Sequence, residues 1–279
     1  MAIKKIGILY HPKVASTRIK AEELGKFLKT QGVSAWVCSA WDGEEACTKM
    51  KDTELLLTVG GDGTILRAVQ AVIPGMTPIA GVNQGKLGFL TELSNDEAVE
   101  KLPFLIAGQG WTDERAMLQA ELKTEGKAPQ VFHALNDIVV ARGAIARLIN
   151  IEVAIDGQKV SLYRADAIVT ATATGSTGYA LAARGPVMYP QSRDFLMVPV
   201  APHLSPAYPL VISEKSEVVL KLNTYQDATL SVDGHINLTL VNGDAVTIRR
   251  SPYIARFRRI RPENSFFSTL EEKLKGKPK

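Results

Sequence analysis

The stretch Glu54-Leu55-Leu56-Leu57-Thr58-Val59-Gly60-Gly61-Asp62-Gly63-Thr64 decides the fold of the N-terminal part of the chain. Its first six residues predict a buried strand, and a helix is predicted over residues 65–72, directly after the glycines. Because glycine has no Cβ, these glycines let the backbone approach a bound group closely, while the free N–H groups of the next helix attract anions. The segment therefore predicts a phosphate-binding loop between a strand and a helix.

Strand and helix segments alternate on both sides of this loop, from residue 5 to about residue 95. The predicted strands are residues 6–10, 33–40 and 77–82, and the predicted helices are residues 44–50 and a segment capped by Ser16 or Thr17 that ends near Thr30. Such alternation is typical of βαβ units with a parallel sheet. The polar loop Asn83-Gln84-Gly85-Lys86-Leu87-Gly88 follows the last of these strands, at the sheet edge where ligands bind.

From about residue 113 the apolar residues recur with a period of two, and turn signals such as Asp156-Gly157 and Asp233-Gly234 separate the runs. This pattern predicts a β-rich half. We therefore predict an α/β domain over residues 1–112 that carries the glycine loop, a β-rich domain over residues 113–265, and a C-terminal helix with a basic tail over residues 266–279. The lysine-rich end from Glu271 is interpreted as a frayed helix without a function of its own.

The composition is that of an ordinary folded protein: 279 residues, 46% hydrophobic and 22% charged, with a net charge of +4 that suits anionic small molecules and nucleic acids equally. Cys38 and Cys47 form no disulfide framework, so we expect a reducing compartment. The N-terminus does not resemble a signal peptide, and no apolar run approaches the roughly 20 residues of a membrane span. We therefore expect a soluble cytoplasmic protein that does not bind membranes.

One dense basic cluster consists of Arg249, Arg250, Arg256, Arg258, Arg259 and Arg261. Its alternation indicates one charged strand face that lies in solvent or at an interface. Only Tyr253 and Phe257 accompany it as aromatic platforms, so we expect no nucleic-acid partner. His11, His133 and His203 lack metal-ligand spacing, so no zinc site is predicted.

Asp62 is the residue that gives the glycine loop its chemistry. A carboxylate inside a phosphate-binding turn repels the ligand unless it binds a metal ion or accepts a proton from an attacking hydroxyl, and both roles belong to phosphoryl transfer. The alternative is that Asp62 only caps a helix that begins at Thr64. The loop lacks the lysine and spacing of a Walker loop and differs from G-x-G-x-x-G, so another group must handle the phosphate charge.

The glycine loop resembles the signature shared by NAD kinases, diacylglycerol and sphingosine kinases and, more loosely, 6-phosphofructokinases. Three further segments resemble NAD kinase motifs in the same order: Asn83-Gln84-Gly85-Lys86-Leu87-Gly88-Phe89-Leu90-Thr91, Asn136-Asp137 and Thr174-Gly175-Ser176-Thr177-Gly178-Tyr179. Weaker counterparts are Pro202-His203-Leu204-Ser205 and Ser231-Val232-Asp233-Gly234-His235, so the resemblance covers nearly the whole chain. The chain is identified as a member of the bacterial-type NAD kinase family.

The resemblance implies an N-terminal α/β domain, a β-rich second domain, and transfer of the γ-phosphoryl group of ATP to the 2′-hydroxyl of the adenosine ribose of NAD, with Mg²⁺ or Mn²⁺. Asp62 would be the base or the metal-linked group, beside the phosphate loop of Gly60, Gly61 and Thr64. No residue is predicted to bind a structural metal ion. Asp62 is the candidate ligand for the divalent cation of the reaction. A homodimer or homotetramer is also implied. The residues implied to bind NAD are Gly63, Asn83, Asn136, Asp137, Asp166, Thr174, Thr177, Gly178, Tyr179, Ala180, Leu181 and Ala182.

The sequence departs from the family pattern at four positions: Asp137 stands where Glu is usual, Ala167 where Gly is common, Ala173 where Pro is common and His235 where Gln is frequent. Asp137 keeps the carboxylate but shortens its reach by one methylene. Weaker candidates for contacts with phosphates or nucleotide are Arg67, Arg147, Arg164 and His235, for which a surface side chain is the alternative.

Two other functions compete with the NAD kinase hypothesis. A lipid kinase of the diacylglycerol or sphingosine type would share the loop over residues 60–64. A regulator that binds a dinucleotide without turnover would keep the pocket, although the intact Asp62 argues against it. Polyphosphate as donor and NADH as acceptor stay open.

Overall fold

The computed structural model describes residues 2–85, 88–145, 147–203 and 208–275. The chain packs as two compact units, one made of Met1–Glu114 with Ala255–Lys279 and the other of Arg115–Ile254. Two strands, β6 (Trp111–Lys123) and β17 (Ala245–Arg259), pass from one unit into the other. The predicted domains over residues 1–112, 113–265 and 266–279 stay predictions.

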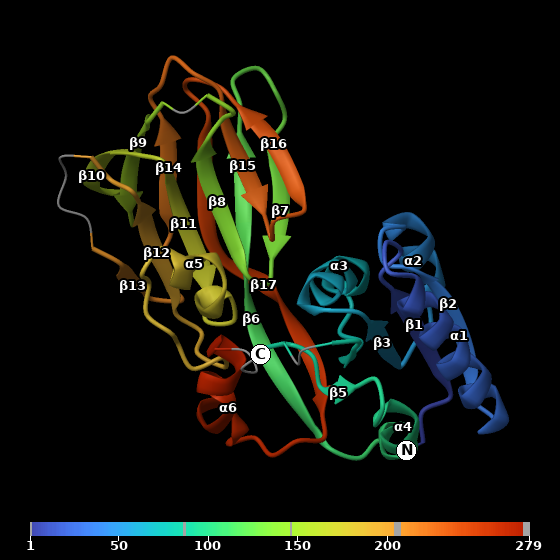
Figure 1. Cartoon of the computed structure of the whole chain (residues 1–279). Coiled ribbons are helices and arrows are strands. Elements are labelled where there is room, and N and C mark those ends of the chain that lie inside the picture. Colours follow the sequence, from blue (N-terminus) through green and yellow to red (C-terminus); the bar gives the residue numbers. More distant parts are fainter. Residues whose placement is uncertain (1, 86–87, 146, 204–207, 276–279) are drawn as a thin grey trace. The chain divides into compact units, whose positions relative to one another are not determined.

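The first unit is a parallel sheet with helices packed against it (Figure 1). Its strands lie in the order β2-β1-β3-β4, each parallel to its neighbour, and Phe257 of β17 pairs in parallel with Ile79 of β4. The elements are β1 (Lys5–Tyr10), α1 (Ala15–Thr30), β2 (Ser34–Ser39), α2 (Gly43–Lys49), β3 (Leu55–Val59), α3 (Asp62–Val72), β4 (Ile79–Asn83), β5 (Leu93–Ser94), α4 (Ala98–Ile106) and α6 (Ser265–Lys275). The α/β prediction for this part of the chain is confirmed.

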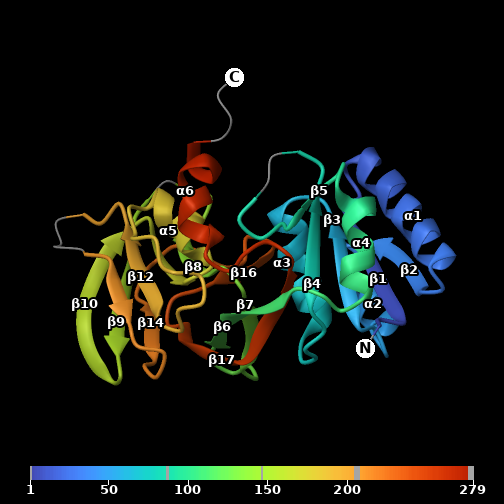
Figure 2. The ribbon, with the colours of Figure 1, turned by 90° about the horizontal axis from the view of Figure 1, so that it is seen from below.

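Helices cover both faces of this sheet (Figure 2). On one face, alternate residues of the strands such as Ile8, Leu57 and Val82 share a core with buried residues of α1 and α4. On the other face, Gly81 lies against α3, where a Cβ at this position would come within 2.7 Å of Ile65 Cδ1. Burial on both faces explains why β3 and β4 are fully buried, and their parallel pairing places the loops that follow them at the same sheet edge.

Two helices begin earlier than predicted. α1 begins at Ala15, and the Thr17 hydroxyl donates to the carbonyls of His11 and Val14 at 2.6 Å each, so the predicted cap at Ser16 or Thr17 is wrong. α3 begins at Asp62 instead of residue 65. The glycine loop is therefore short, and residues 62–64 form the first turn of the helix.

The second unit is antiparallel (Figure 1). One set of strands has the order β10-β9-β14-β17, a second sheet has the order β13-β12-β11-β8-β15-β16, and β6 pairs with β7. Its elements besides β6 and β17 are β7 (Gln130–Ala134), β8 (Asp137–Arg142), β9 (Ile149–Ile155), β10 (Gln158–Ala165), β11 (Ala167–Thr172), η1 (Gly175–Thr177), α5 (Tyr179–Ala182), β12 (Phe195–Val200), β13 (Leu210–Ile212), β14 (Val218–Leu222), β15 (Ala228–Val232) and β16 (Ile236–Leu240). The predicted β-rich half is confirmed.

A single core joins the two sheets of the second unit. Val153 of β9 and Leu220 of β14 pack in the same buried cluster as Val140 of β8, Ile168 of β11 and Leu230 of β15. The inward residues alternate with outward ones along each strand, as the period of two predicts.

The C-terminal segment forms α6 (Ser265–Lys275), whereas residues 276–279 of the predicted basic tail lie outside the described residues. Among the described helices, none combines the length and the apolar character that a membrane crossing requires.

Candidate active site

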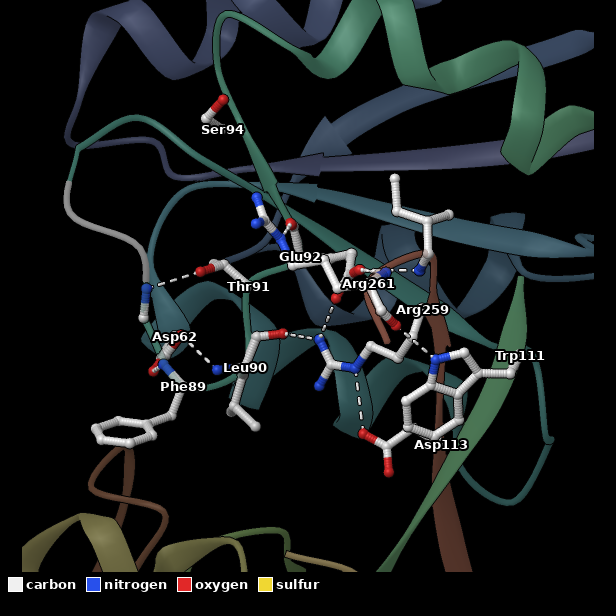
Figure 3. A network of polar contacts seen from close by, with 12 residues as sticks. Asp62, Phe89, Leu90, Thr91, Glu92, Ser94, Trp111, Asp113, Arg259 and Arg261 are labelled. Carbon is white, nitrogen blue, oxygen red and sulfur yellow. Dashed lines mark hydrogen bonds and ion pairs between the residues drawn. The ribbon is translucent and has the colours of Figure 1, made fainter. Parts of the chain in front are cut away.

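Asp62 is the first residue of α3, immediately after the strand β3 and the glycine pair. Its carboxylate accepts two backbone hydrogen bonds from the loop after β4: Phe89 N–H donates to Oδ2 at 2.8 Å and Leu90 N–H donates to Oδ1 at 3.1 Å (Figure 3). Gly61 occupies the N-cap position and Asp62 is the first helical residue, so the interpretation of Asp62 as a helix cap is wrong. Because each carboxylate oxygen has two lone pairs, both oxygens can still accept a further proton donor.

The glycines around Asp62 divide into two kinds. Gly60 has a positive φ of 156°, and a Cβ on it would lie 2.3 Å from Thr64 Oγ1. Likewise, a Cβ on Gly88 would lie 2.2 Å from Asp62 Oδ1. For Gly61 and Gly63, by contrast, a Cβ would meet no described atom within 4 Å. The packing of the protein thus requires the first pair, whereas the second pair leaves the backbone at the start of α3 uncovered.

A buried ionic network holds the loop that contacts Asp62 (Figure 3). Arg259 Nη1 donates to the Leu90 carbonyl at 2.7 Å and pairs with Glu92 Oε2 at 3.3 Å, and its Nε pairs with Asp113 Oδ2 at 3.1 Å. Arg259 is only 7% exposed, so the interpretation of the basic cluster as a solvent or interface face is wrong for this residue. The physical reason is the pair of buried carboxylates, which compensates a charge that burial would otherwise destabilise.

Two other predicted residues of the first unit have internal contacts. Asn83 is buried at the end of β4, where its Oδ1 accepts from Gly85 N–H at 3.1 Å. Arg67 lies in the second turn of α3 with its guanidinium carbon 4.1 Å from the centroid of the Trp41 ring, and burial lowers its pKa. Their contacts with nucleotide stay predictions. Residues 86–87 of the same motif lie outside the described residues.

In the second unit, two motifs that are distant in the sequence lie together. Thr172 N–H donates to the Asn136 carbonyl at 2.9 Å, and a Cβ on Gly175 would lie 2.1 Å from that carbonyl oxygen. A Cβ on Gly178 would lie 3.9 Å from Asp137 Oδ2 and 4.0 Å from Asn136 Nδ2. The amide and the carboxylate therefore line the same surface as the turn over residues 174–178.

Asn136 also carries a buried oxygen without a partner. Its Oδ1 accepts no hydrogen bond from any described residue. A buried carbonyl oxygen without a donor lowers stability by about 1–3 kcal/mol, so its retention favours a role in binding a donor group of a ligand.

Asp233 holds this surface in place, whereas the sequence had indicated a turn and a weak family counterpart over residues 231–235 but no role for its carboxylate. Its carboxylate accepts from the N–H groups of Leu135 at 2.8 Å, Asn136 at 2.7 Å and Asp137 at 3.1 Å. Asp233 is 7% exposed, and burial raises its pKa to about 7 although the N–H groups act in the opposite direction. The Asp-Gly pair in the sequence marks the left-handed turn at Asp233, but neither it nor the family counterpart over residues 231–235 indicates the partners of the carboxylate.

A second residue that sequence reasoning missed is Arg115. Its Nη1 donates to Thr174 Oγ1 at 3.1 Å, and both side chains are buried. Thr177 Oγ1 donates to the Thr174 carbonyl at 3.2 Å. These contacts fix the turn that precedes α5.

α5 carries the last four residues predicted to bind NAD, Tyr179, Ala180, Leu181 and Ala182. Ala180 is buried, whereas Tyr179 and Ala182 are exposed. This pattern leaves one side of the short helix available to a ligand.

The remaining predicted residues of the second unit lie at its surface. Asp166 Oδ1 accepts from Arg142 Nε at 2.7 Å, and Arg147 and Arg164 are exposed. His235 Nδ1 lies 3.2 Å from the Asp233 carbonyl oxygen. Their contacts with NAD stay predictions.

Asp137 leads to a testable pH dependence. It is 8% exposed, and burial raises the pKa of its carboxyl to about 6. Since the ionised form is the better acceptor for hydroxyl groups, we expect the KM for NAD to rise as the pH falls through about 6. The measurement is the KM for NAD at pH values from about 5 to 8. An Asp137→Asn control should lose most of the dependence although Asp233 remains, and a flat profile in the unmodified protein would contradict the expectation.

The raised pKa of Asp137 also makes the stability of the folded state depend on pH. The folded pKa of Asp137, about 6, lies above the ordinary value of an aspartate, 3.8. The folded state therefore binds more protons between these values, and the stability contributed by the protonated carboxyl is lost as the pH rises through about 6.

Comparisons with known proteins agree over both units. Family models described as the ATP-NAD kinase N-terminal domain and the ATP-NAD kinase C-terminal domain match residues 6–109 and 135–260. An NAD kinase of Dehalococcoides mccartyi is 46% identical over 274 residues, which cover 98% of this chain and 96% of the relative. An NAD kinase of Chloroflexus aurantiacus is 35% identical over 273 residues, which cover 98% and 99%.

Two solved structures are similar over nearly the full length. Yeast NADH kinase complexed with NADH superposes with a TM-score of 0.88 at 27% identity, covering 100% of this chain and 89% of that one. An NAD kinase from Archaeoglobus fulgidus in complex with ATP superposes with a TM-score of 0.79 at 25% identity, covering 98% and 100%.

The fold, the Asp62 loop and these similarities define a kinase with an α/β unit and an antiparallel β unit. The chain belongs to the ATP-NAD kinase family. Its activity is the conversion of NAD to NADP with ATP, as predicted, and the lipid kinase and the regulator without turnover are thereby set aside.

Proposed function

We propose that the enzyme transfers the γ-phosphoryl group of ATP to the 2′-hydroxyl of the adenosine ribose of NAD, and that Asp62 accepts the proton of this hydroxyl. The hydroxyl oxygen forms a bond to the γ-phosphorus, the bond from that phosphorus to the β-phosphate oxygen breaks, and ADP leaves. The observation that carries the proposal is the carboxylate of Asp62, which two N–H groups orient at the start of α3. Positioning of the nucleophile is the main requirement for a loose phosphoryl-transfer transition state.

The uncovered backbone next to Asp62 supports the placement of a phosphate there. Gly61 and Gly63 have open space where a Cβ would stand, and they lie at the N-terminus of α3. We infer that the donor phosphates approach residues 60–64, because N–H groups at a helix N-terminus bind anions.

Asn136 and Asp137 supply the matching groups for NAD. The unpartnered Oδ1 of Asn136 suits the exocyclic amino group of adenine, and the carboxylate of Asp137 suits ribose hydroxyls. Gly178 is exposed beside them, and a Cβ there would lie 3.9 Å from Asp137 Oδ2 and 4.0 Å from Asn136 Nδ2. Asp166, Thr174, Thr177 and the residues of α5 complete the proposed NAD site of the second unit, and the NADH in the similar yeast structure supports a dinucleotide ligand.

A divalent cation, Mg²⁺ or Mn²⁺, is part of the proposal. Among the described residues, no group of three or more His, Cys, Asp or Glu side chains lies together in a way that could hold a metal ion. This fits a cation that arrives with the phosphates and keeps water ligands, as Mg²⁺ commonly does, with Asp62 as the one carboxylate offered by the loop. When bound, the cation supplies neutralisation of the phosphate charge.

We further propose that the enzyme works in the cytoplasm as a homodimer or homotetramer. Both cysteines, Cys38 and Cys47, are free thiols, and burial raises the pKa of Cys38 to about 11. Unpaired thiols suit a reducing compartment.

Incubation of the purified protein with NAD and ATP labelled at the γ-phosphate tests the proposed reaction. We expect label in a product that an NADP-specific dehydrogenase reduces, because such an enzyme reads the 2′-phosphate. Mixtures without NAD or without divalent cation are the controls. Label on the 3′-hydroxyl, or in inorganic phosphate alone, would contradict the proposal.

A further inference from the structure

α6 (Ser265–Lys275) brings a lysine to the loop that contacts Asp62. The Lys273 ammonium lies 5.6 Å from the centroid of the Phe89 ring. The backbone N–H of Phe89 donates to Asp62 Oδ2 at 2.8 Å, so a single residue links the ammonium to the carboxylate (Figure 3). A contact of this kind over an aromatic face holds a cation in position.

Lys273 has no carboxylate partner within the described part of the chain. The nearby acids are engaged elsewhere: Asp62 accepts from the Phe89 and Leu90 N–H groups, and Glu92 pairs with Arg259. Burial and the charge of Arg259 lower the pKa of Lys273, while Asp62 and Glu92 raise it. Such an ammonium group has three hydrogen-bond donors, and a bound anion would stabilise its charge.

We propose that Lys273 binds the phosphates of the donor nucleotide at the Asp62 loop and neutralises charge on the transferred phosphoryl group. In P-loop kinases a lysine inside the glycine loop has this role, and the loop over residues 60–64 contains none. In this chain the proposed lysine, Lys273, lies on α6, far from the glycine loop in the sequence. The inference rests on the proposed placement of ATP at residues 60–64.

The competing explanation is structural, since Lys273 could serve only to attach α6 to Phe89. The two explanations differ in what they change. A phosphate ligand acts on ATP and on the rate of transfer, whereas an attachment of α6 acts on stability and on both substrates alike.

The experiment compares Lys273→Met and Lys273→Arg in the full-length enzyme. For Lys273→Met we expect kcat to fall by about 100-fold. The KM for ATP should rise by about tenfold while the KM for NAD changes by less than about twofold. Lys273→Arg should restore most of kcat because the charge is kept. The melting temperature should stay within about 2 °C for both variants.

Lys101→Met is the matched control. Lys101 also lies over a phenylalanine ring of the same unit, 5.7 Å from the centroid of Phe104, but it pairs with Glu100. We expect kcat and both KM values to remain at the level of the unmodified enzyme.

Unchanged kcat and unchanged KM for ATP in Lys273→Met would overturn the inference. So would a joint loss of ATP and NAD affinity with a lowered melting temperature and no rescue by arginine. If Lys273→Met does not fold, calorimetric titration of Lys273→Gln with ATP replaces it, and ATP affinity equal to that of the unmodified protein would likewise overturn the inference. Failure of the proposed function is distinguishable, because the unmodified enzyme would then form no 2′-phosphate.

Discussion

Replacement of Asp62 by asparagine is expected to lower kcat by about 10³-fold while the affinity for NAD stays within about threefold of the unmodified value. Asparagine has nearly the same shape and keeps one oxygen for the Phe89 or Leu90 N–H group. It cannot accept the proton of the attacking hydroxyl, and its NH₂ group opposes the second N–H donor. NADP formation gives kcat, and calorimetric titration gives the affinity for NAD.

Asp52→Asn is the control for this experiment, because Asp52 is an exposed aspartate of the same unit. Its kcat should equal that of the unmodified enzyme. If Asp62→Asn keeps kcat within about threefold, Asp62 is not the proton acceptor.

Replacement of Asp233 by alanine is expected to have the largest effect on stability. The change leaves the backbone N–H groups of Leu135, Asn136 and Asp137 without their acceptor in a buried site. Each unsatisfied group costs about 1–3 kcal/mol, so we expect the free energy of unfolding to fall by about 3 kcal/mol or more. Because the same bonds fix the residues proposed to hold NAD, the KM for NAD should rise by at least about tenfold. Urea unfolding and initial rates measure the two effects.

Asp233→Asn provides a graded comparison and carries the test if the alanine variant does not fold. Oδ1 of Asp233 accepts from Asn136 and Asp137, so an asparagine carbonyl at this place retains two of the three bonds. Its loss of stability should be less than half that of alanine. The proposal that Asp233 holds residues 135–137 in place is refuted if the alanine variant is as stable as the unmodified enzyme. It is also refuted if the KM values of this variant for NAD and ATP rise equally.

The sequence predicted those parts of the fold that depend on local signals. The apolar run before Gly60 and the pattern of period two after residue 113 each report which faces of a strand are buried, and both predictions are confirmed. The start of α3 was placed three residues late because Asp62 and Gly63 are weak helix formers by themselves. Their helical conformation depends on packing, which propensity does not describe.

The parts of the candidate site that the sequence did not predict depend on distant partners. Asp233 accepts from residues more than 90 positions earlier, and Arg259 binds a carbonyl 169 positions earlier. No periodicity or spacing indicates such pairs. The resemblance to a family indicated candidate ligand-binding residues, but the positions that hold them, such as Arg115 beside Thr174, became visible only in three dimensions.

The passage of the chain through β6 and back through β17 has a consequence for biosynthesis. Arg259 can donate its hydrogen bond to the Leu90 carbonyl only after residue 259 has been translated. A nascent chain that still lacks this return strand has no Arg259 to donate to the Leu90 carbonyl or to pair with Glu92 and Asp113. We therefore expect the loop that contacts Asp62 to reach its final shape only after strand β17 has been made.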